Sequence, residues 1–192
     1  MQKPDVSTKN MNQKQAHREG SGISTGFPPI ARADARVLVL GSLPSAASLR
    51  AQQYYAHPRN AFWNIMRVIA GATGEYVSRC RALEERGIAV WDVLQRSVRP
   101  GSLDADIDMA SAVPNDFAGF FAGHRQVRLV CFNGRKSQDM FRRLVQPGLS
   151  LRGIEFALLP STSPAHASLR FAGKLDTWRG IIEPQLRQGQ QQ

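Results

Sequence analysis

Aromatic and amide side chains gather in one short segment of this sequence, residues 54–63. It contains Tyr54, Tyr55, His57, Asn60 and Phe62. Aromatic faces can stack on nucleobases, and amides can pair with base edges through adjacent donor and acceptor groups. The segment follows an apolar run at 37–40 that ends at a glycine, which predicts a buried strand leading into a ligand-binding loop. The chemistry that these residue types favour is base recognition.

Carboxylates are scarce at the ends of the apolar runs, where only Asp92 qualifies. A two-carboxylate hydrolase and a two-metal nuclease are therefore not expected. Asp92 has two interpretations: it pairs with an arginine and holds a loop, which we favour, or it acts as a base for water. Cys80 and Cys131 lie far apart, so we expect no metal site, no iron–sulfur cluster and no cofactor.

The chain is strongly basic, with 25 Lys and Arg against 15 Asp and Glu and a net charge of +10 among 192 residues. This balance favours nucleic acid as a partner, although it also occurs in basic proteins without one. Residues 1–33 are polar and predict a disordered basic tail, followed by one domain over 34–192. We find no apolar run long enough to span a membrane and no secretory signal, so a cytoplasmic location is expected.

Short apolar runs alternate with helical patterns after residue 34. The runs predict strands at 37–40, 88–94, 127–132 and 156–159, and the periodic segments predict helices at 61–70, 77–86, 135–145 and 174–186, with another helix starting at Pro114. The segment 97–112 is turn-rich. This order predicts an α/β fold, a three-layer αβα sandwich around a central four-stranded parallel sheet. Polar residues follow each strand and should converge at one sheet edge: Ser42, Ser45, Asp92, Asn133, Ser161 and Ser163.

Four patterns in order carry a family resemblance: GSLPS from Gly41, YYAHPRNAFW from Tyr54, FNG from Phe132 and LPSTSPAHA ending at Ala167. Together they resemble the uracil-DNA glycosylase superfamily and its mismatch-specific uracil/thymine DNA glycosylases. The closer resemblance is to the hypoxanthine-DNA glycosylase branch, also called DNA-deoxyinosine glycosylase. The resemblance covers the folded domain and does not extend to the tail.

The resemblance implies roles for individual residues. In the mismatch-specific enzymes an asparagine of the first motif orients the attacking water; Leu43 stands there in this chain, as in the hypoxanthine branch. The catalytic role then falls on Asn60, which could also cap the helix that follows. Tyr55 is expected to stack on the base while Tyr54 packs inside. Asn133 is expected to bind the base edge, although Asn-Gly is also a turn dipeptide.

The remaining expected contacts are with the base or with the DNA backbone. Further base contacts are expected from Ser42, Leu43 and Phe62. Contacts with DNA are expected from Ser45, His57, Arg59, Ser161, Thr162, Ser163, His166 and Arg170. Leu169 or Arg170 could fill the gap left by a flipped base. Arg135 and Lys136 could contact the backbone or form a solvated face.

The resemblance implies a monofunctional DNA glycosylase that removes a deaminated base, with hypoxanthine as the expected base. It would act as a monomer on double-stranded DNA, without a metal or iron–sulfur cluster. Uracil, xanthine or mismatch-specific excision is the alternative within the class. A catalytically silent nucleic-acid-binding module and an enzyme acting on free nucleosides are the alternatives outside it.

Overall fold

The computed structural model describes residues 22–101 and 103–187. Its centre is a four-stranded parallel sheet in the order β3-β2-β6-β7. The strands are β2 (Val37–Gly41), β3 (Ile88–Asp92), β6 (Leu129–Asn133) and β7 (Glu155–Leu159). Each lies at a predicted position, so the expected parallel sheet is confirmed.

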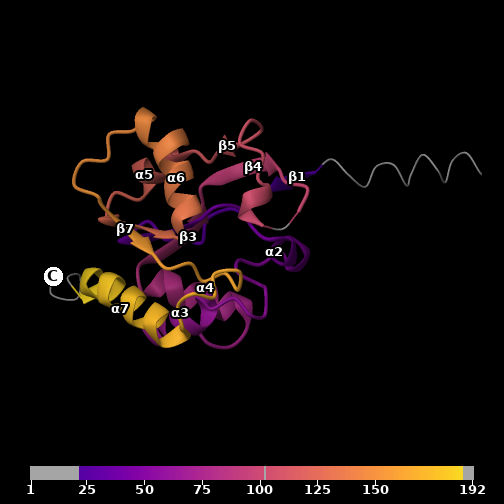
Figure 1. Cartoon of the computed structure of the whole chain (residues 1–192). Coiled ribbons are helices and arrows are strands. Elements are labelled where there is room, and N and C mark those ends of the chain that lie inside the picture. The colour runs from indigo at the N-terminus through magenta and orange to yellow at the C-terminus, as the bar shows by residue number, and fades with distance from the viewer. Residues whose placement is uncertain (1–21, 102, 188–192) are drawn as a thin grey trace, which may run out of the picture.

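Helices cover both faces of this sheet (Figure 1). One face carries α5 (Phe117–Gly123) and α6 (Arg135–Leu144), while the other carries α3 (Phe62–Ala70), α4 (Tyr76–Glu85) and α7 (Phe171–Arg187). This is the predicted three-layer αβα sandwich. No helix in the described part of the chain is long and apolar enough to cross a membrane.

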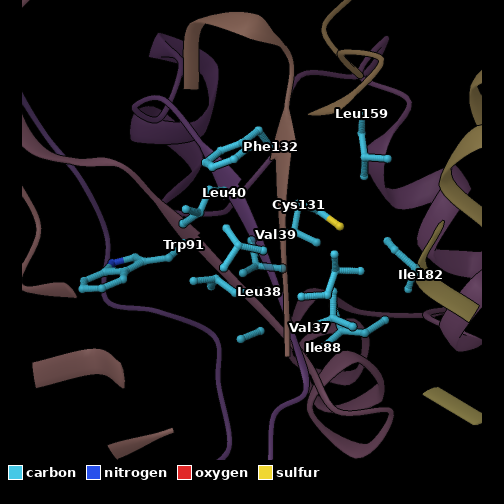
Figure 2. Packing of buried hydrophobic residues seen from close by; sticks show 14 of the residues in the cluster. Val37, Leu38, Val39, Leu40, Ile88, Trp91, Cys131, Phe132, Leu159 and Ile182 are labelled. Atoms are coloured by element: carbon cyan, nitrogen blue, oxygen red, sulfur yellow. The ribbon is translucent and has the colours of Figure 1, made fainter. Parts of the chain in front are cut away.

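Strands β2, β3 and most of β6 are apolar and buried on both faces, whereas in the edge strand β7 only Leu159 is fully buried. Alternate side chains of each strand point to opposite helical layers. Figure 2 shows Trp91, Leu40 and Phe132 on one side of the strands and Cys131 on the other, toward Ile182 of α7. Two layers of core therefore fix the sheet, and the strand ends are held in register.

Three features differ from the sequence-based expectation. A second, three-stranded antiparallel sheet is formed by β1 (Ile23–Thr25), β4 (Leu94–Val98) and β5 (Val113–Pro114). The helix expected from Pro114 is present as α5 but starts three residues later: Pro114 pairs with Leu94, and α5 begins after Asp116, whose carboxylate accepts a hydrogen bond from the Gly119 amide. A short helix, α2 (Ala46–Ala51), was not expected.

The folded domain also begins earlier than the expected boundary between the tail and the domain at residue 33. Strand β1 and the segment through Ile30 belong to the fold, because β1 pairs with β4 and Ile30 bridges to Val90. Ser24 is buried in this strand. Residues 1–21 of the predicted tail lie outside the described residues.

Candidate active site

A pocket of about 390 Å³ opens at the carboxyl edge of the parallel sheet. This is the edge where open α/β sheets bind their ligands, and the volume lies within the usual range of ligand pockets. Asp92, Gly41 and Asn133 end three neighbouring strands there. The pocket is lined by Gly41, Ser42, Leu43, Pro44, Ser45, Ser48, Tyr54, Tyr55, Asn60, Asp92, Leu103, Asp104, Ala105, Asn133, Gly134, Arg135, Lys136, Ser161, Thr162, Ser163, Ala165 and His166.

Tyr55 lies in the pocket wall with one ring face covered. Its ring stacks on Phe62 with centroids 3.9 Å apart and planes at 22°, so its opposite face is the one that a base can use. Its backbone φ of 54° is unusual for a bulky residue, and such strained positions cluster at functional sites. Burial and the nearby Asp92 raise the pKa of the Tyr55 hydroxyl, while Asn133 lowers it.

Tyr54 and Phe62 support Tyr55 from inside. Tyr54 is 3% exposed, and its hydroxyl donates to the Phe27 and Pro28 carbonyls at 3.2 Å, as its expected packing role requires. Phe62 is 0% exposed and does not line the pocket. This corrects the expected direct contact between Phe62 and the base. The Phe62 ring is covered by the core on one side and by Tyr55 on the other.

Asn60 lines the pocket just before α3, and its side chain is already oriented. Its Oδ1 accepts a hydrogen bond of 3.0 Å from the Phe62 backbone amide, and the Asn60 backbone N–H donates to the His57 carbonyl at 2.8 Å. Asn60 lies one residue before the N-cap position of α3, which is Ala61, and its side chain bonds to the first backbone amide of the helix. Because an amide oxygen has two lone pairs and the NH₂ group has two donors, Asn60 keeps capacity to hold a water molecule.

Asn133 is held by one residue of the loop after β7. Its Oδ1 accepts from the Thr162 amide and its Nδ2 donates to Thr162 Oγ1, both at 2.8 Å. Thr162 is 1% exposed, and its carbonyl accepts from the Ala61 amide at 3.0 Å. Thr162 thus joins β6, the loop and the start of α3. Asn133 retains one N–H and one lone pair for a ligand.

Two acidic residues form another part of the pocket wall. Ser42 is buried and its hydroxyl donates to Asp104 Oδ1, so this hydroxyl is directed at the carboxylate. Asp104 comes from a 3₁₀ turn, Asp104–Asp106, in the segment between β4 and β5. The guanidinium of the buried Arg99 donates hydrogen bonds to the Pro44 carbonyl and to Ser24 Oγ.

Asp92 is 3% exposed, and its Oδ2 has no hydrogen-bond partner among the described residues. Burial raises the pKa of Asp92 to about 8, with a further contribution from Asp104 that Arg99 opposes. The favoured expectation that an arginine pairs with Asp92 is wrong, because no ion pair within 4.0 Å joins them in the part of the chain described.

The residues expected to contact DNA fall into two groups. Ser45, Ser161, Ser163 and His166 line the pocket with Thr162, whereas His57, Arg59 and Arg170 do not. His166 and Arg170 are exposed, as is Arg59. Ser45 caps α2 by accepting from the Ser48 amide at 3.3 Å. The buried Thr162 is positioned to hold Asn133 rather than to meet a phosphate.

Sequence reasoning did not place Asp104 or Arg99 at the site. Both come from a segment that the sequence marks only as turn-rich, and no local pattern shows which strand end it covers. Arg135 and Lys136 also line the pocket, which adds positive charge at the start of α6. No group of three potential metal-ligating side chains occurs in residues 22–101 and 103–187.

The fold and pocket together define an α/β protein with a base-sized site at a sheet edge, of the kind that uracil-DNA glycosylases share. The model of the uracil DNA glycosylase superfamily matches residues 28–186. The chain belongs to this superfamily.

Two archaeal proteins named hypoxanthine DNA glycosylase are similar to it. The one from Methanosarcina acetivorans is 38% identical over 167 residues, covering 83% of this chain and 98% of that protein. The one from Methanosarcina barkeri is 35% identical over 144 residues, covering 73% and 87%. A solution NMR structure from M. acetivorans, provisionally named a uracil DNA glycosylase, superposes with a TM-score of 0.70 at 33% identity, covering 85% of this chain and 98% of that one.

Proposed function

We propose that this protein is a monofunctional DNA glycosylase that removes hypoxanthine from deoxyinosine in duplex DNA. The flipped base enters the pocket, stacks on the free face of Tyr55 and bonds to Asn133. Asn60 holds a water molecule against the anomeric carbon, and water attack breaks the N-glycosidic bond. Base flipping costs a few kcal/mol and is easiest at a mispair, which favours a deaminated base as substrate.

The observation that carries the proposal is the arrangement of Tyr55, Asn60 and Asn133 around one pocket at the sheet edge. These three residues come from different segments, yet each is fixed by its own contact: with Phe62, with the α3 amide and with Thr162. A monomer as the active form stays a prediction from the sequence. The names of the two Methanosarcina relatives support hypoxanthine as the base. A cytoplasmic location stays a prediction from the sequence.

A strand-nicking assay tests this proposal. Labelled duplexes carrying one inosine, uracil or xanthine are incubated with the protein and with Asn60→Ala and Asn133→Ala, and then treated with alkali or left untreated. We expect alkali-dependent nicking at inosine that falls at least 100-fold in Asn60→Ala, because a misplaced nucleophile costs about that much. Asp139→Asn on the exposed side of α6 is the matched control and should retain full activity.

Each other result points to a different reading. Nicking at uracil alone would keep the mechanism and change the substrate. Nicking without alkali would indicate a lyase step, for which Lys136 is the lysine that lines the pocket. Tight binding to every duplex without base loss would contradict the enzyme and favour a silent binding module. Activity on free deoxyinosine without dependence on salt would favour a nucleoside-processing enzyme.

A further inference from the structure

The carboxyl group of Asp92 lies where a flipped base would meet it. Asp92 lines the pocket from the end of β3, directly beside Gly41 in the register of the parallel sheet. The two residues are so close that a Cβ on Gly41 would clash with Asp92 Oδ1 and come within 3.2 Å of the Tyr55 hydroxyl. The glycine therefore makes room for the carboxyl group between the strand and the base-stacking tyrosine.

This carboxyl group does not stabilise the fold through a bond that we can identify. Its Oδ2 is buried without a hydrogen-bond partner among the described residues. A buried polar group without a partner is unfavourable, and a catalytic role is one of the reasons why a native structure retains such a group. Asp92 is 97% buried but lines the pocket. A base bound in the pocket would supply the hydrogen-bond partner that its Oδ2 lacks.

Burial favours the neutral form of Asp92 most strongly, and the charge of Asp104 adds to this effect. Asp104 adds a second negative charge from the 3₁₀ turn, while Arg99 opposes it without forming an ion pair. Tyr54 and Tyr55 face it from the segment after α2, and both hydroxyls are held neutral because burial raises their pKa. With its pKa at about 8, Asp92 carries a proton at neutral pH.

We propose that Asp92 is a further catalytic residue of the proposed glycosylase, whose neutral carboxyl group donates its proton to the departing base. This inference rests on the proposed function. When the bond between the anomeric carbon and the base nitrogen breaks, its electron pair moves to the base. The Asp92 proton then bonds to the base, which leaves as a neutral molecule, and Asp92 becomes a carboxylate. Water bonds to the anomeric carbon and releases a proton, which returns Asp92 to its acid form.

A donor of this kind would complement Asn60 and Asn133. Asn60 can position a water molecule and Asn133 can bind the base edge, but neither amide can give up a proton. General acids contribute about 10²–10⁴-fold to such reactions and work best with a pKa near the working pH. A carboxyl group with a pKa of about 8 meets this condition at neutral pH.

The pH profile of single-turnover inosine excision tests the proposal. The wild-type rate should fall above about pH 8, as Asp92 loses its proton. Asp92→Asn should lose about 100-fold at pH 7 and show no fall above pH 8, since the amide cannot transfer a proton. Asp104→Asn should move the fall to lower pH, because it removes a charge that raises the Asp92 pKa. Asp139→Asn serves as the control and should leave the profile unchanged.

Thermal unfolding of the same variants separates this role from a structural one. The folded protein binds the Asp92 proton more tightly than the unfolded chain does. The free energy of unfolding should therefore fall as the pH rises above 3.8, the ordinary pKa of aspartate, and continue to fall until about pH 8. Asp92→Asn should remove this loss and melt higher than wild type at pH 8.

Two outcomes would overturn the inference. One is an Asp92→Asn variant that excises inosine at the wild-type rate with the same alkaline fall. The other is a variant that loses activity together with its fold, which would make Asp92 structural. Neither outcome affects the proposed function, which fails if the wild-type protein does not remove hypoxanthine.

Discussion

Removing the hydroxyl of Thr162 should weaken both stability and excision by releasing Asn133. Thr162→Val keeps the shape of the side chain but removes the Oγ1 atom that accepts from Asn133 Nδ2 at 2.8 Å. An unsatisfied buried donor costs about 1–3 kcal/mol, and because Asn133 is half-buried we expect a loss near 1 kcal/mol. The amide then loses one of its two fixed bonds and no longer presents one orientation to the base.

Urea unfolding and single-turnover excision of hypoxanthine from a deoxyinosine duplex measure the two effects. An orientation loss of about 1–2 kcal/mol corresponds to a rate loss of roughly 5–30-fold. Thr162→Ser is the matched control: it retains the hydroxyl, so excision should stay within a few-fold of wild type. If Thr162→Val loses stability but excises at the wild-type rate, the fixed orientation of Asn133 is not needed, and the reasoning is refuted.

Two further substitutions test the pocket wall. Tyr55→Ala should weaken binding of an inosine duplex by about 1–3 kcal/mol through lost stacking, while Tyr55→Phe should bind nearly as tightly as wild type. A fluorescence titration measures both affinities. Equal binding by the two variants would contradict stacking on Tyr55. Gly41→Ala should lower both excision and melting temperature, because the new Cβ displaces Asp92 and Tyr55. Gly180→Ala is its control: Gly180 lies in α7 with open space around the added methyl, so this substitution should stabilise the fold. Equal effects at the two glycines would refute the claim that the new Cβ at Gly41 is crowded by Asp92 and Tyr55.

The sequence predicted the parallel sheet well because three of its four strands, β2, β3 and β6, are buried on both faces. Runs such as Val37–Gly41 are apolar without alternation, and this pattern depends only on local composition. The helix α3 was equally clear from its apolar stripe. The strand ends then follow from topology, which is why Tyr55, Asn60 and Asn133 could be expected at one edge.

The antiparallel sheet could not be predicted in the same way. Burial along β4 does not alternate strictly, so its sequence carries no clear two-residue period. Strands β1 and β5, with three and two residues, are too short to carry a periodic signal. Their pairing joins residues that are about 75 positions apart, as the Ile23–Val98 pair shows. Asp104 lines the pocket from the connection between β4 and β5, and Arg99 lies behind it near Asp92, so neither position could be inferred from the sequence.

Asp92 was misjudged for a different reason. An isolated aspartate usually pairs with a cation, and the chain offers many arginines. Only the three-dimensional environment shows that Asp92 is buried beside Gly41 with an unpaired oxygen. Burial and neighbouring charge, which decide its protonation, are not local properties of the sequence.

Release of free hypoxanthine from a deoxyinosine duplex tests the central claim most directly. The base is separated by chromatography after incubation with wild-type protein or with Asn60→Ala, and binding of the same duplex is measured in parallel. We predict that wild type releases hypoxanthine and leaves an abasic site, whereas Asn60→Ala binds the duplex but releases the base at least 100-fold more slowly. Equal release by both proteins, or no release by the wild type, would contradict a glycosylase that uses Asn60 to hold its water.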